Sequence, residues 1–328
     1  MLDVGINAAP LAAARTGVGR YIAGLLDALA ALAPEGVRAR PLFAAPSSSA
    51  GLRAAVKRLP GAYALAEAGR AMLLERERRR GMSVYHETNH AAPPFRGSVV
   101  LTVHDLSTVL HPGTQEPARA RHFARSLLAR ARKARRVVVP TEAIAREVRQ
   151  HLRVEPSRLR VIHHGVDARF TPPGDRPRRE FVLYVGDQGP RKGLETLRLA
   201  LPFGVELVLA GPPGRYVSED ELLRLYREAA ALVLPSLYEG FGLPLLEAMA
   251  CGAPCIASDD PALMEVSGGA ALHFPRGDAP ALREALRRVL GDAALRDELS
   301  RRGVERARAF RWDQCAARHV EAYREAAA

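Results

Sequence analysis

The sequence predicts an α/β protein built from two parallel-sheet domains, and three observations support that prediction. Short apolar runs of strand length alternate with longer stretches of helical periodicity, which is the order typical of parallel sheets with crossover helices. The 328 residues suit two domains of ordinary size, and a hydrophobic content of 48% is enough for two cores. The segment from Thr171 to Asp175 is rich in Pro and Gly and reads as a linker. We therefore expect domains over 1–172 and 173–305, followed by a final helix within 306–328.

The first half of the chain supplies six strand candidates and four helical stretches. The strand candidates are Leu2–Ile6, Val37–Phe43, Val84–His86, Val99–Val103, Val137–Val139 and Leu159–Ile162. The helical stretches are 21–32, 51–82, 119–136 and 142–152. Thr141 stands where the N-cap of the last stretch would lie, because its hydroxyl can accept a hydrogen bond from the first turn.

The second half repeats the alternation. Its strand candidates are Phe181–Val185, Val205–Ala210, Leu232–Leu234 and Cys255–Ala257. A short helix is expected after Gly193, and longer ones over 218–230, 278–290, 294–310 and 312–323. Ser218 and Glu221 have the spacing of a capping box, which places the start of the helix that ends near Ala230.

The most informative stretch of the chain is Ala231 to Asp259. It reads as a buried strand, a glycine-bearing loop, a helix over Leu245 to Ala250 preceded by Pro244, and a second buried strand. The loop therefore lies at the carboxyl edge of a parallel sheet, where ligands bind such sheets. Gly240 and Gly242 allow a ligand to approach the backbone closely. The amides of Phe241, Gly242 and Leu243 have no partner inside the helix and predict a phosphate site.

Two carboxylates flank this phosphate site. Glu239 stands before the helix and Glu247 is expected in its first turn. Because a phosphate repels a carboxylate, we expect both side chains to accept hydrogen bonds from hydroxyl groups instead. A phosphate between two hydroxyl-bearing parts is the layout of a nucleotide sugar. The alternative is a helix start stabilised by Glu247, which leaves Glu239 and the two glycines unexplained.

The segment EGFGLPLLEAMACGAP, with seven residues between Glu239 and Glu247, resembles the signature of the retaining glycosyltransferases of family 4. The resemblance implies the GT-B fold, in which two Rossmann-like domains face a cleft and the last helix returns to the N-terminal domain. The N-terminal domain would be the acceptor side, and the C-terminal domain would bind the nucleotide sugar. The implied reaction moves a hexose from a GDP- or UDP-sugar, for example GDP-mannose, to a glycan or a lipid-linked acceptor.

The same resemblance assigns further positions. Arg191 and Lys192 are adjacent cations after a strand and would clamp the donor diphosphate, although exposed loop charges are the alternative. His104 follows a strand and would lie beside the donor sugar, with a histidine bonded inside its own loop as the alternative. The expected catalytic residues are Glu239, Arg191, Lys192 and His104. The expected donor-binding residues are Gly17, Gly19, Gly186, Gly240, Phe241, Gly242, Leu243, Glu247, Tyr216 and Val217.

One segment departs from the family pattern. Relatives usually place a helix, a strand and a second helix between the strand that ends at Ala210 and the strand at Leu232, whereas residues 211–230 leave room for one crossover helix. We therefore expect a shortened second domain with an altered pocket for the nucleotide base. This departure keeps open the alternative of a non-catalytic relative that binds nucleotide sugar or a partner. Another enzyme with the GT-B fold, such as a sugar-nucleotide epimerase, is a further alternative.

Composition narrows the remaining classes. The net charge of +12 suits a phosphorylated substrate, anionic lipid or nucleic acid, but the arginine runs lack the interleaved aromatics that stack on bases. The basic stretches 76–80 and 119–136 favour a solvated helix face, with peripheral contact to an anionic membrane as the alternative. The chain has neither a run of about 20 apolar residues nor a secretory pattern, so a cytoplasmic location is expected.

Neither a metal nor a cofactor is expected. The sequence has no Asp-x-Asp pair in a suitable loop. The three cysteines are Cys251, Cys255 and Cys315, and no histidine lies near enough to the first two to complete a zinc pattern. We interpret all three as small buried residues.

Overall fold

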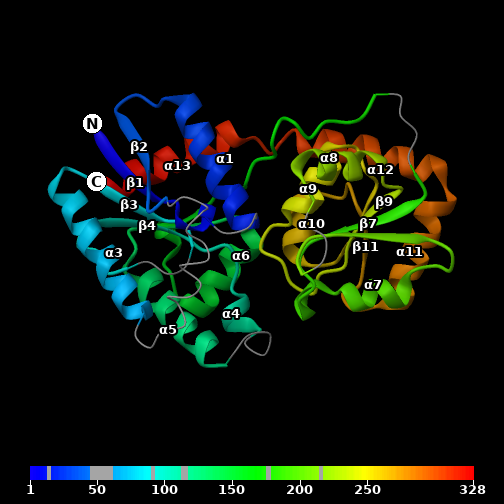
Figure 1. The fold of residues 1–328 in the computed structure, drawn as a ribbon, viewed down its shortest axis with the longest axis horizontal. Coiled ribbons are helices and arrows are strands. Elements are labelled where there is room, and N and C mark those ends of the chain that lie inside the picture. The colour runs from blue at the N-terminus through cyan, green and yellow to red at the C-terminus, as the bar shows by residue number, and fades with distance from the viewer. Residues whose placement is uncertain (13–15, 45–61, 90–92, 112–116, 175–178, 214–216) are drawn as a thin grey trace. The chain divides into compact units, whose positions relative to one another are not determined.

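The computed structural model describes residues 1–12, 16–44, 62–89, 93–111, 117–174, 179–213 and 217–328. The chain divides into two compact units. The first unit comprises 1–165 together with 312–328, and the second comprises 166–311. Each unit is an α/β domain with its own parallel sheet (Figure 1). None of the helices in these described ranges has both the length and the apolar character that crossing a membrane requires.

The first unit is built on a six-stranded parallel sheet with the order β2-β1-β3-β4-β5-β6. The strands are β1 Leu2–Asn7, β2 Val37–Leu42, β3 Val84–Glu87, β4 Ser98–Thr102, β5 Arg136–Val139 and β6 Leu159–Val161. All six match strand candidates from the sequence to within one or two residues. β3 is buried along its whole length, as expected for a central strand of a sheet that helices cover on both faces.

Apart from the four-residue helix α4, which the sequence did not predict, the helices of the first unit follow the predicted order with shifted ends. They are α1 Gly17–Leu32, α3 Ala62–Arg79, α4 Ser107–Leu110, α5 Pro117–Lys133, α6 Glu142–Glu147 and α13 Trp312–Ala327, with 3-10 turns η1 Ala9–Ala12 and η5 Pro156–Arg158. α6 continues as the π-helix η4, Val148–Leu152. The helix expected over 119–136 ends at Lys133, because Arg136 already belongs to β5. Of the helix expected over 51–82, residues 51–61 lie outside the described residues.

The helix expected over 21–32 begins four residues earlier than the sequence predicts. α1 begins at Gly17, because the Thr16 hydroxyl accepts a hydrogen bond from the Gly19 amide at 3.1 Å and caps the helix there. A Ser or Thr at the N-cap position stabilises the start of a helix. Here the cap that Thr16 provides outweighs the low helix propensity of the two glycines. Both glycines therefore lie in the first turn of α1.

Helix α13 packs in the core of the first unit, beside α1 (Figure 1). The core residues that it contributes include Cys315, Ala316, Val320 and Tyr323. A methyl group added at Gly24 on α1 would lie 2.3 Å from the indole of Trp312. The close approach of the two helices therefore depends on glycine at this position.

The second unit has a five-stranded parallel sheet with the order β11-β10-β9-β7-β8. Its strands are β7 Phe181–Val185, β8 Glu206–Ala210, β9 Ala231–Leu234, β10 Cys255–Ser258 and β11 Leu272–Phe274. Its helices are α7 Leu194–Ala200, α8 Glu219–Glu228, α9 Leu243–Ala250, α10 Pro261–Ser267, α11 Ala279–Gly291 and α12 Ala293–Ala307, with the 3-10 turn η6 Pro190–Lys192. The sequence had predicted neither β11 nor α10, both of which are very short.

Among the described residues between β8 and β9, α8 is the one crossover helix, as the length of residues 211–230 predicted. The Ser218 hydroxyl accepts a hydrogen bond from the Glu221 amide at 3.1 Å and caps this helix. The strand order shows where a ligand would be expected. The chain leaves β7 toward β8 on one side, while β9 lies on the other side of β7. The carboxyl ends of β7 and β9 therefore form a topological switch point, where open α/β sheets bind ligands.

Candidate functional site

The loops that follow β7 and β9 are packed directly against each other. The Leu237 amide donates to the Arg191 carbonyl oxygen at 2.8 Å. Gly193 has a φ of 66°, and a side chain there would lie 2.0 Å from the Pro235 carbonyl oxygen. Only glycine permits this contact, so the two loops form one rigid surface at the switch point.

This surface brings together three of the predicted catalytic residues. Lys192 Nζ donates to Glu239 Oε1 at 2.6 Å. Arg191 Nη1 donates to the Tyr238 carbonyl oxygen at 3.1 Å and lies 4.0 Å from Glu239 Oε2. The Lys192 ammonium keeps further donors for a ligand, since it carries three N–H groups. Two cations and one carboxylate therefore share the end of the sheet.

The Glu239 side chain is buried, with 8% of its surface exposed, and two residues absent from the sequence prediction hold it. Ser236 Oγ donates to Glu239 Oε1 at 2.7 Å. Asp260 Oδ2 accepts the Glu239 amide at 3.3 Å. The position of Ser236, two residues after the end of β9, was a signal that could have identified it, because residues at the carboxyl ends of parallel strands meet at one edge of the sheet. Asp260 is far away in sequence, and only the adjacency of β9 and β10 brings it close.

Glu247 lies on α9, which begins at Leu243 rather than Leu245. The expectation that Glu247 lies in the first turn is therefore wrong, and it lies in the second. Its carboxylate is 4% exposed and accepts a hydrogen bond from the Tyr226 hydroxyl at 2.8 Å. Gly242 precedes the helix with a φ of 91°, and a side chain there would lie 2.4 Å from Leu263 Cδ2. This conformation starts the helix early and requires glycine.

The remaining donor-binding predictions for the second unit fall in different environments. Gly186 directly follows β7, and its amide donates a hydrogen bond to the Ala210 carbonyl oxygen at 2.9 Å. Phe241 is buried, and its ring packs edge-on against Phe310 with 5.9 Å between the ring centroids. Its side chain therefore belongs to the core, and only its backbone is suited to contact a ligand. Val217 packs against the same core. Gly240 and Leu243 are buried at the start of α9, and Tyr216 lies outside the described residues.

His104 follows β4 in the first unit and is partly exposed. Its Nε2 donates to the Thr88 carbonyl oxygen at 2.9 Å, which fixes the proton of a neutral ring on that nitrogen. The Tyr21 ring meets the imidazole edge-on at 4.9 Å. His104 is therefore held firmly at the carboxyl edge of the first sheet.

Comparison with known proteins identifies the family. A family model described as Glycosyltransferase Family 4 matches residues 15–170, and one described as Glycosyl transferases group 1 matches residues 214–306. The chain belongs to glycosyltransferase family 4. It is 27% identical over 281 residues to an O-antigen chain mannosyltransferase B of Escherichia coli, covering 74% of each chain. It is 31% identical over 272 residues to an MMP alpha-(1->4)-mannosyltransferase of Mycolicibacterium hassiacum, covering 68% of this chain and 66% of that protein.

Solved structures show the fold of this family member. A sucrose-phosphate synthase from Thermosynechococcus elongatus superposes with a TM-score of 0.77 at 22% identity, over 99% of this chain and 98% of that one. WaaG, a glycosyltransferase involved in lipopolysaccharide biosynthesis, superposes with a TM-score of 0.70 at 14% identity, over 98% and 99%. The fold is GT-B, with two parallel-sheet α/β domains.

In this glycosyltransferase, Asp260 is a buried carboxyl group that contacts the charged cluster. Its Oδ1 caps α10 by accepting the amides of Ala262 and Leu263, and 1% of the residue is exposed. Burial, together with the nearby Glu239 charge, raises the pKa of Asp260 to about 6. Arg276 Nη1, 3.9 Å from Asp260 Oδ2, is the described cation closest to this carboxylate.

The first unit of the glycosyltransferase contains a buried chain of hydrogen bonds between uncharged side chains, in contrast to the charged cluster of the second unit. His319 Nδ1 must donate to the Cys315 carbonyl oxygen at 2.8 Å, so His319 Nε2 accepts from the Tyr21 hydroxyl at 2.8 Å. Tyr21 then accepts from Thr102 at 3.0 Å. The chain continues through His86 Nε2, which donates to Thr102 at 2.7 Å, and ends where the Tyr323 hydroxyl donates to His86 Nδ1 at 2.8 Å.

Burial favours the neutral form of both histidines in this chain. It lowers the pKa of His319 to about 4 and holds the pKa of His86 well below its ordinary value. His164 is also buried, stacks on Trp312 and has a pKa lowered in the same way. These groups tie α13 to α1, β3 and β4, which is a structural role.

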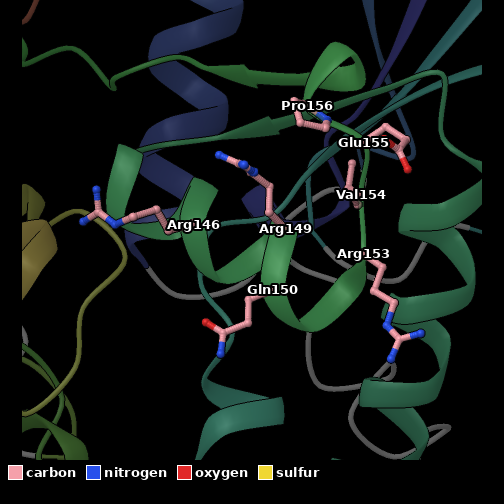
Figure 2. Close-up of a pocket in the computed structure, with 7 residues that line it drawn as sticks. All are labelled: Arg146, Arg149, Gln150, Arg153, Val154, Glu155 and Pro156. Atoms are coloured by element: carbon pink, nitrogen blue, oxygen red, sulfur yellow. The ribbon is translucent and has the colours of Figure 1, made fainter.

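A hollow of about 560 Å³ opens on the first unit beside α6 and η4. Its lining includes Arg146, Arg149, Gln150 and Arg153, and none of the predicted site residues lines it. Figure 2 shows the side chains of Arg149 and Arg153 pointing in different directions. The guanidinium groups therefore do not converge on one point, as a phosphate site in this glycosyltransferase would require.

Proposed function

We propose that the protein is a retaining glycosyltransferase that moves a hexose from a nucleotide-diphospho-sugar to a glycan or a lipid-linked acceptor. GDP- and UDP-sugars are the proposed donors, with GDP-mannose first because two of the relatives are named mannosyltransferases. The observation that supports this most strongly is the cluster of Arg191, Lys192 and Glu239 at the switch point, next to the start of α9.

Arg191, Lys192 and the backbone amides that follow Gly240 are the proposed diphosphate site. Breaking the bond at the anomeric carbon builds negative charge on the leaving phosphate. Fixed cations and amides stabilise that charge most strongly in the transition state, so they lower the barrier more than they tighten ground-state binding. Arg191 is already oriented by its bond to the Tyr238 carbonyl oxygen.

The two carboxylates are proposed to bind hydroxyl groups on either side of the diphosphate. Glu239 would accept from the transferred sugar and Glu247 from the ribose. Glu239 already accepts hydrogen bonds from Lys192 and Ser236, and Glu247 accepts one from Tyr226, which supports the role of both carboxylates as acceptors. Gly186, Tyr216 and Val217 are proposed to border the nucleotide.

In the first unit, we propose the roles that the family resemblance implies. His104 would contact the transferred sugar, and Gly17 and Gly19 would present the start of α1 to the substrates. The firm placement of His104 by Thr88 and Tyr21 supports this role. His104→Ala is expected to lower kcat, and an unchanged kcat would remove His104 from the proposal.

Retention and independence from metal ions are part of the proposal. The acceptor would attack on the same face that the leaving phosphate departs from, and its proton would pass to that phosphate. NMR of the first-formed product reports its anomeric configuration directly. Activity that survives exhaustive chelation is expected, since the two cations and the helix amides supply the charge that a metal ion would otherwise provide.

A peripheral contact with an anionic membrane is also proposed for the first unit, on helix α3. Met72 and Leu73 are exposed there at 69% and 48%, and Arg76, Arg79 and Arg80 follow on the exposed surface. Apolar and basic side chains on one helix suit the headgroup region of a membrane. Met72→Ser with Leu73→Ser should reduce co-sedimentation with phosphatidylglycerol vesicles.

A donor screen followed by a transfer assay tests the proposed function. A nucleotide sugar at 100 times its dissociation constant should stabilise the protein by about 2.7 kcal/mol, which a thermal-shift screen of UDP-, GDP- and ADP-sugars detects. The stabilising donor should then give a glycoside product with a suitable acceptor. Tight binding without transfer would point to a non-catalytic relative, and an epimerised nucleotide sugar would point to an epimerase. Either result would contradict the proposal.

A further inference from the structure

The hydrogen bonds of Glu239 are distributed unequally over its two carboxylate oxygens. Oε1 accepts from both Ser236 Oγ, at 2.7 Å, and Lys192 Nζ, at 2.6 Å. The described residues give Oε2 no hydrogen-bond donor, and Arg191 Nη1 lies 4.0 Å away from it. One oxygen is therefore fixed by the protein, while the other keeps its lone pairs for a ligand.

The backbone of Glu239 is fixed from a different direction. Asp260 Oδ2 accepts the Glu239 amide at 3.3 Å, while its Oδ1 accepts the Ala262 amide at 2.9 Å at the start of α10. Ser236 is fixed in turn, because Ser258 Oγ donates to its carbonyl oxygen at 2.5 Å. All of these groups are buried. Glu239 and its partner Ser236 are thus anchored to β10 through Ser258 and to the N-cap of α10 through Asp260.

We propose that Ser236 and Asp260 are positioning residues that hold Glu239 with Oε2 directed at the transferred sugar. This inference rests on the proposed function, in which Glu239 contacts that sugar. Neither residue needs to touch the substrate. Their effect arises because a carboxylate displaced by about 1 Å costs on the order of 10²-fold in rate.

Replacement of Ser236 tests the side-chain anchor. Ser236→Ala should lower kcat ten- to hundredfold, while the dissociation constant of the nucleoside diphosphate, which lacks the sugar, stays within twofold. Ser267→Ala is the matched control, because Ser267 is equally buried in the same unit and its hydroxyl bonds His273 and the Met264 carbonyl oxygen instead. An equal loss of kcat in both variants, or wild-type kcat in Ser236→Ala, would overturn the role of Ser236.

Asp260→Asn tests the backbone anchor without any need for turnover. The amide resonance of Glu239 in selectively labelled protein should titrate with a midpoint near pH 6 in the wild type, because Asp260 titrates there in contact with that amide. Glu239, Arg276 and the neighbouring Asp259 are the charged groups around Asp260. The titration should persist in Ser236→Ala and vanish in Asp260→Asn.

The two failures are distinguishable. A Glu239 amide resonance that is the same in Asp260→Asn and in the wild type at every pH would overturn the role of Asp260, whatever the enzyme does. A wild type that transfers no sugar, with the Glu239 amide titrating as stated, would contradict the proposed function and leave the Asp260 contact intact.

Discussion

The two units contain polar networks of opposite kinds. In the first unit, five buried side chains form a chain of neutral donors and acceptors from Tyr323 through His86, Thr102 and Tyr21 to His319. In the second unit the network is charged, because Lys192 donates to the Glu239 carboxylate and Asp260 accepts from the Glu239 amide. A neutral chain whose members all have partners is stable without a ligand. A partly exposed charged cluster at a switch point has donors left over, which suits it to binding.

The two carboxylates that accept a tyrosine hydroxyl offer the sharpest form of this comparison. Glu247 accepts from Tyr226 in the second unit, and Glu87 accepts from Tyr85 and Asn7 in the first. Glu247→Gln should lower transfer at least about 10³-fold, because an uncharged amide binds ribose hydroxyls more weakly and presents N–H groups to them. Transfer kinetics and a thermal melt measure the effect.

Glu87→Gln is the control for that prediction. This substitution removes a fully buried carboxyl group, and burial raises the pKa of that group. We expect kcat to stay within about threefold of the wild type, while the melting temperature changes. Equal kcat losses in the two variants would erase the distinction between a functional and a structural carboxylate.

Acid should destabilise the first unit, because its buried histidines are neutral in the folded state and become protonated on unfolding. The pKa of His319 falls from its ordinary value of 6.5 to about 4 on folding, so the unfolded chain takes up the proton first. The stability that neutral His319 contributes is complete above pH 6.5 and is lost as the pH falls toward 4, by up to about 3 kcal/mol. Urea unfolding at pH 7 and pH 5 measures this loss.

The variant His319→Gln tests whether His319 causes this pH dependence of stability. Its amide offers one acceptor and one donor group but does not titrate, so the difference in unfolding free energy between pH 7 and pH 5 should shrink. A pH dependence that equals that of the wild type would place the titration elsewhere.

Loss of a single tyrosine hydroxyl should have the smallest effect. Tyr226→Phe removes the donor to Glu247 and should weaken transfer about ten- to hundredfold, since one hydrogen bond to a charged group contributes about 1.5 to 3 kcal/mol. Tyr323→Phe removes the donor to His86 and should lower stability by about 1 to 3 kcal/mol with little change in transfer. The reverse pattern would contradict the roles assigned to the two units.

Much of this architecture could be predicted from the sequence, because strand-length apolar runs and helix periodicity are local. Ten of the strands and the single crossover α8 follow from such patterns. The three-residue strand β11 and the seven-residue helix α10 were too short to show a period. The start of α1 was predicted too late in the chain, because Gly17 and Gly19 have low helix propensity. The N-cap Thr16 nevertheless starts the helix at Gly17.

The site residues could be predicted from the sequence only where several of them lie in one short segment or follow one strand. Glu239, Gly242 and Glu247 lie in one stretch, and the pair Arg191 and Lys192 follows one strand, so their proximity follows from the order of the strands. Asp260 and Tyr226 could not be predicted, because they meet the site through packing of α10 and α8.

The central claim is that Arg191 and Lys192 bind the diphosphate of the donor. Isothermal titration calorimetry tests it with the nucleoside diphosphate of the stabilising donor and with the matching nucleoside, on the wild type, Lys192→Ala and, as an exposed control from α11, Arg287→Ala. We predict that Lys192→Ala weakens diphosphate binding at least about tenfold, which is about 1.4 kcal/mol, while nucleoside binding is unchanged and Arg287→Ala binds as the wild type does. Equal diphosphate affinity in Lys192→Ala and the wild type would contradict the claim.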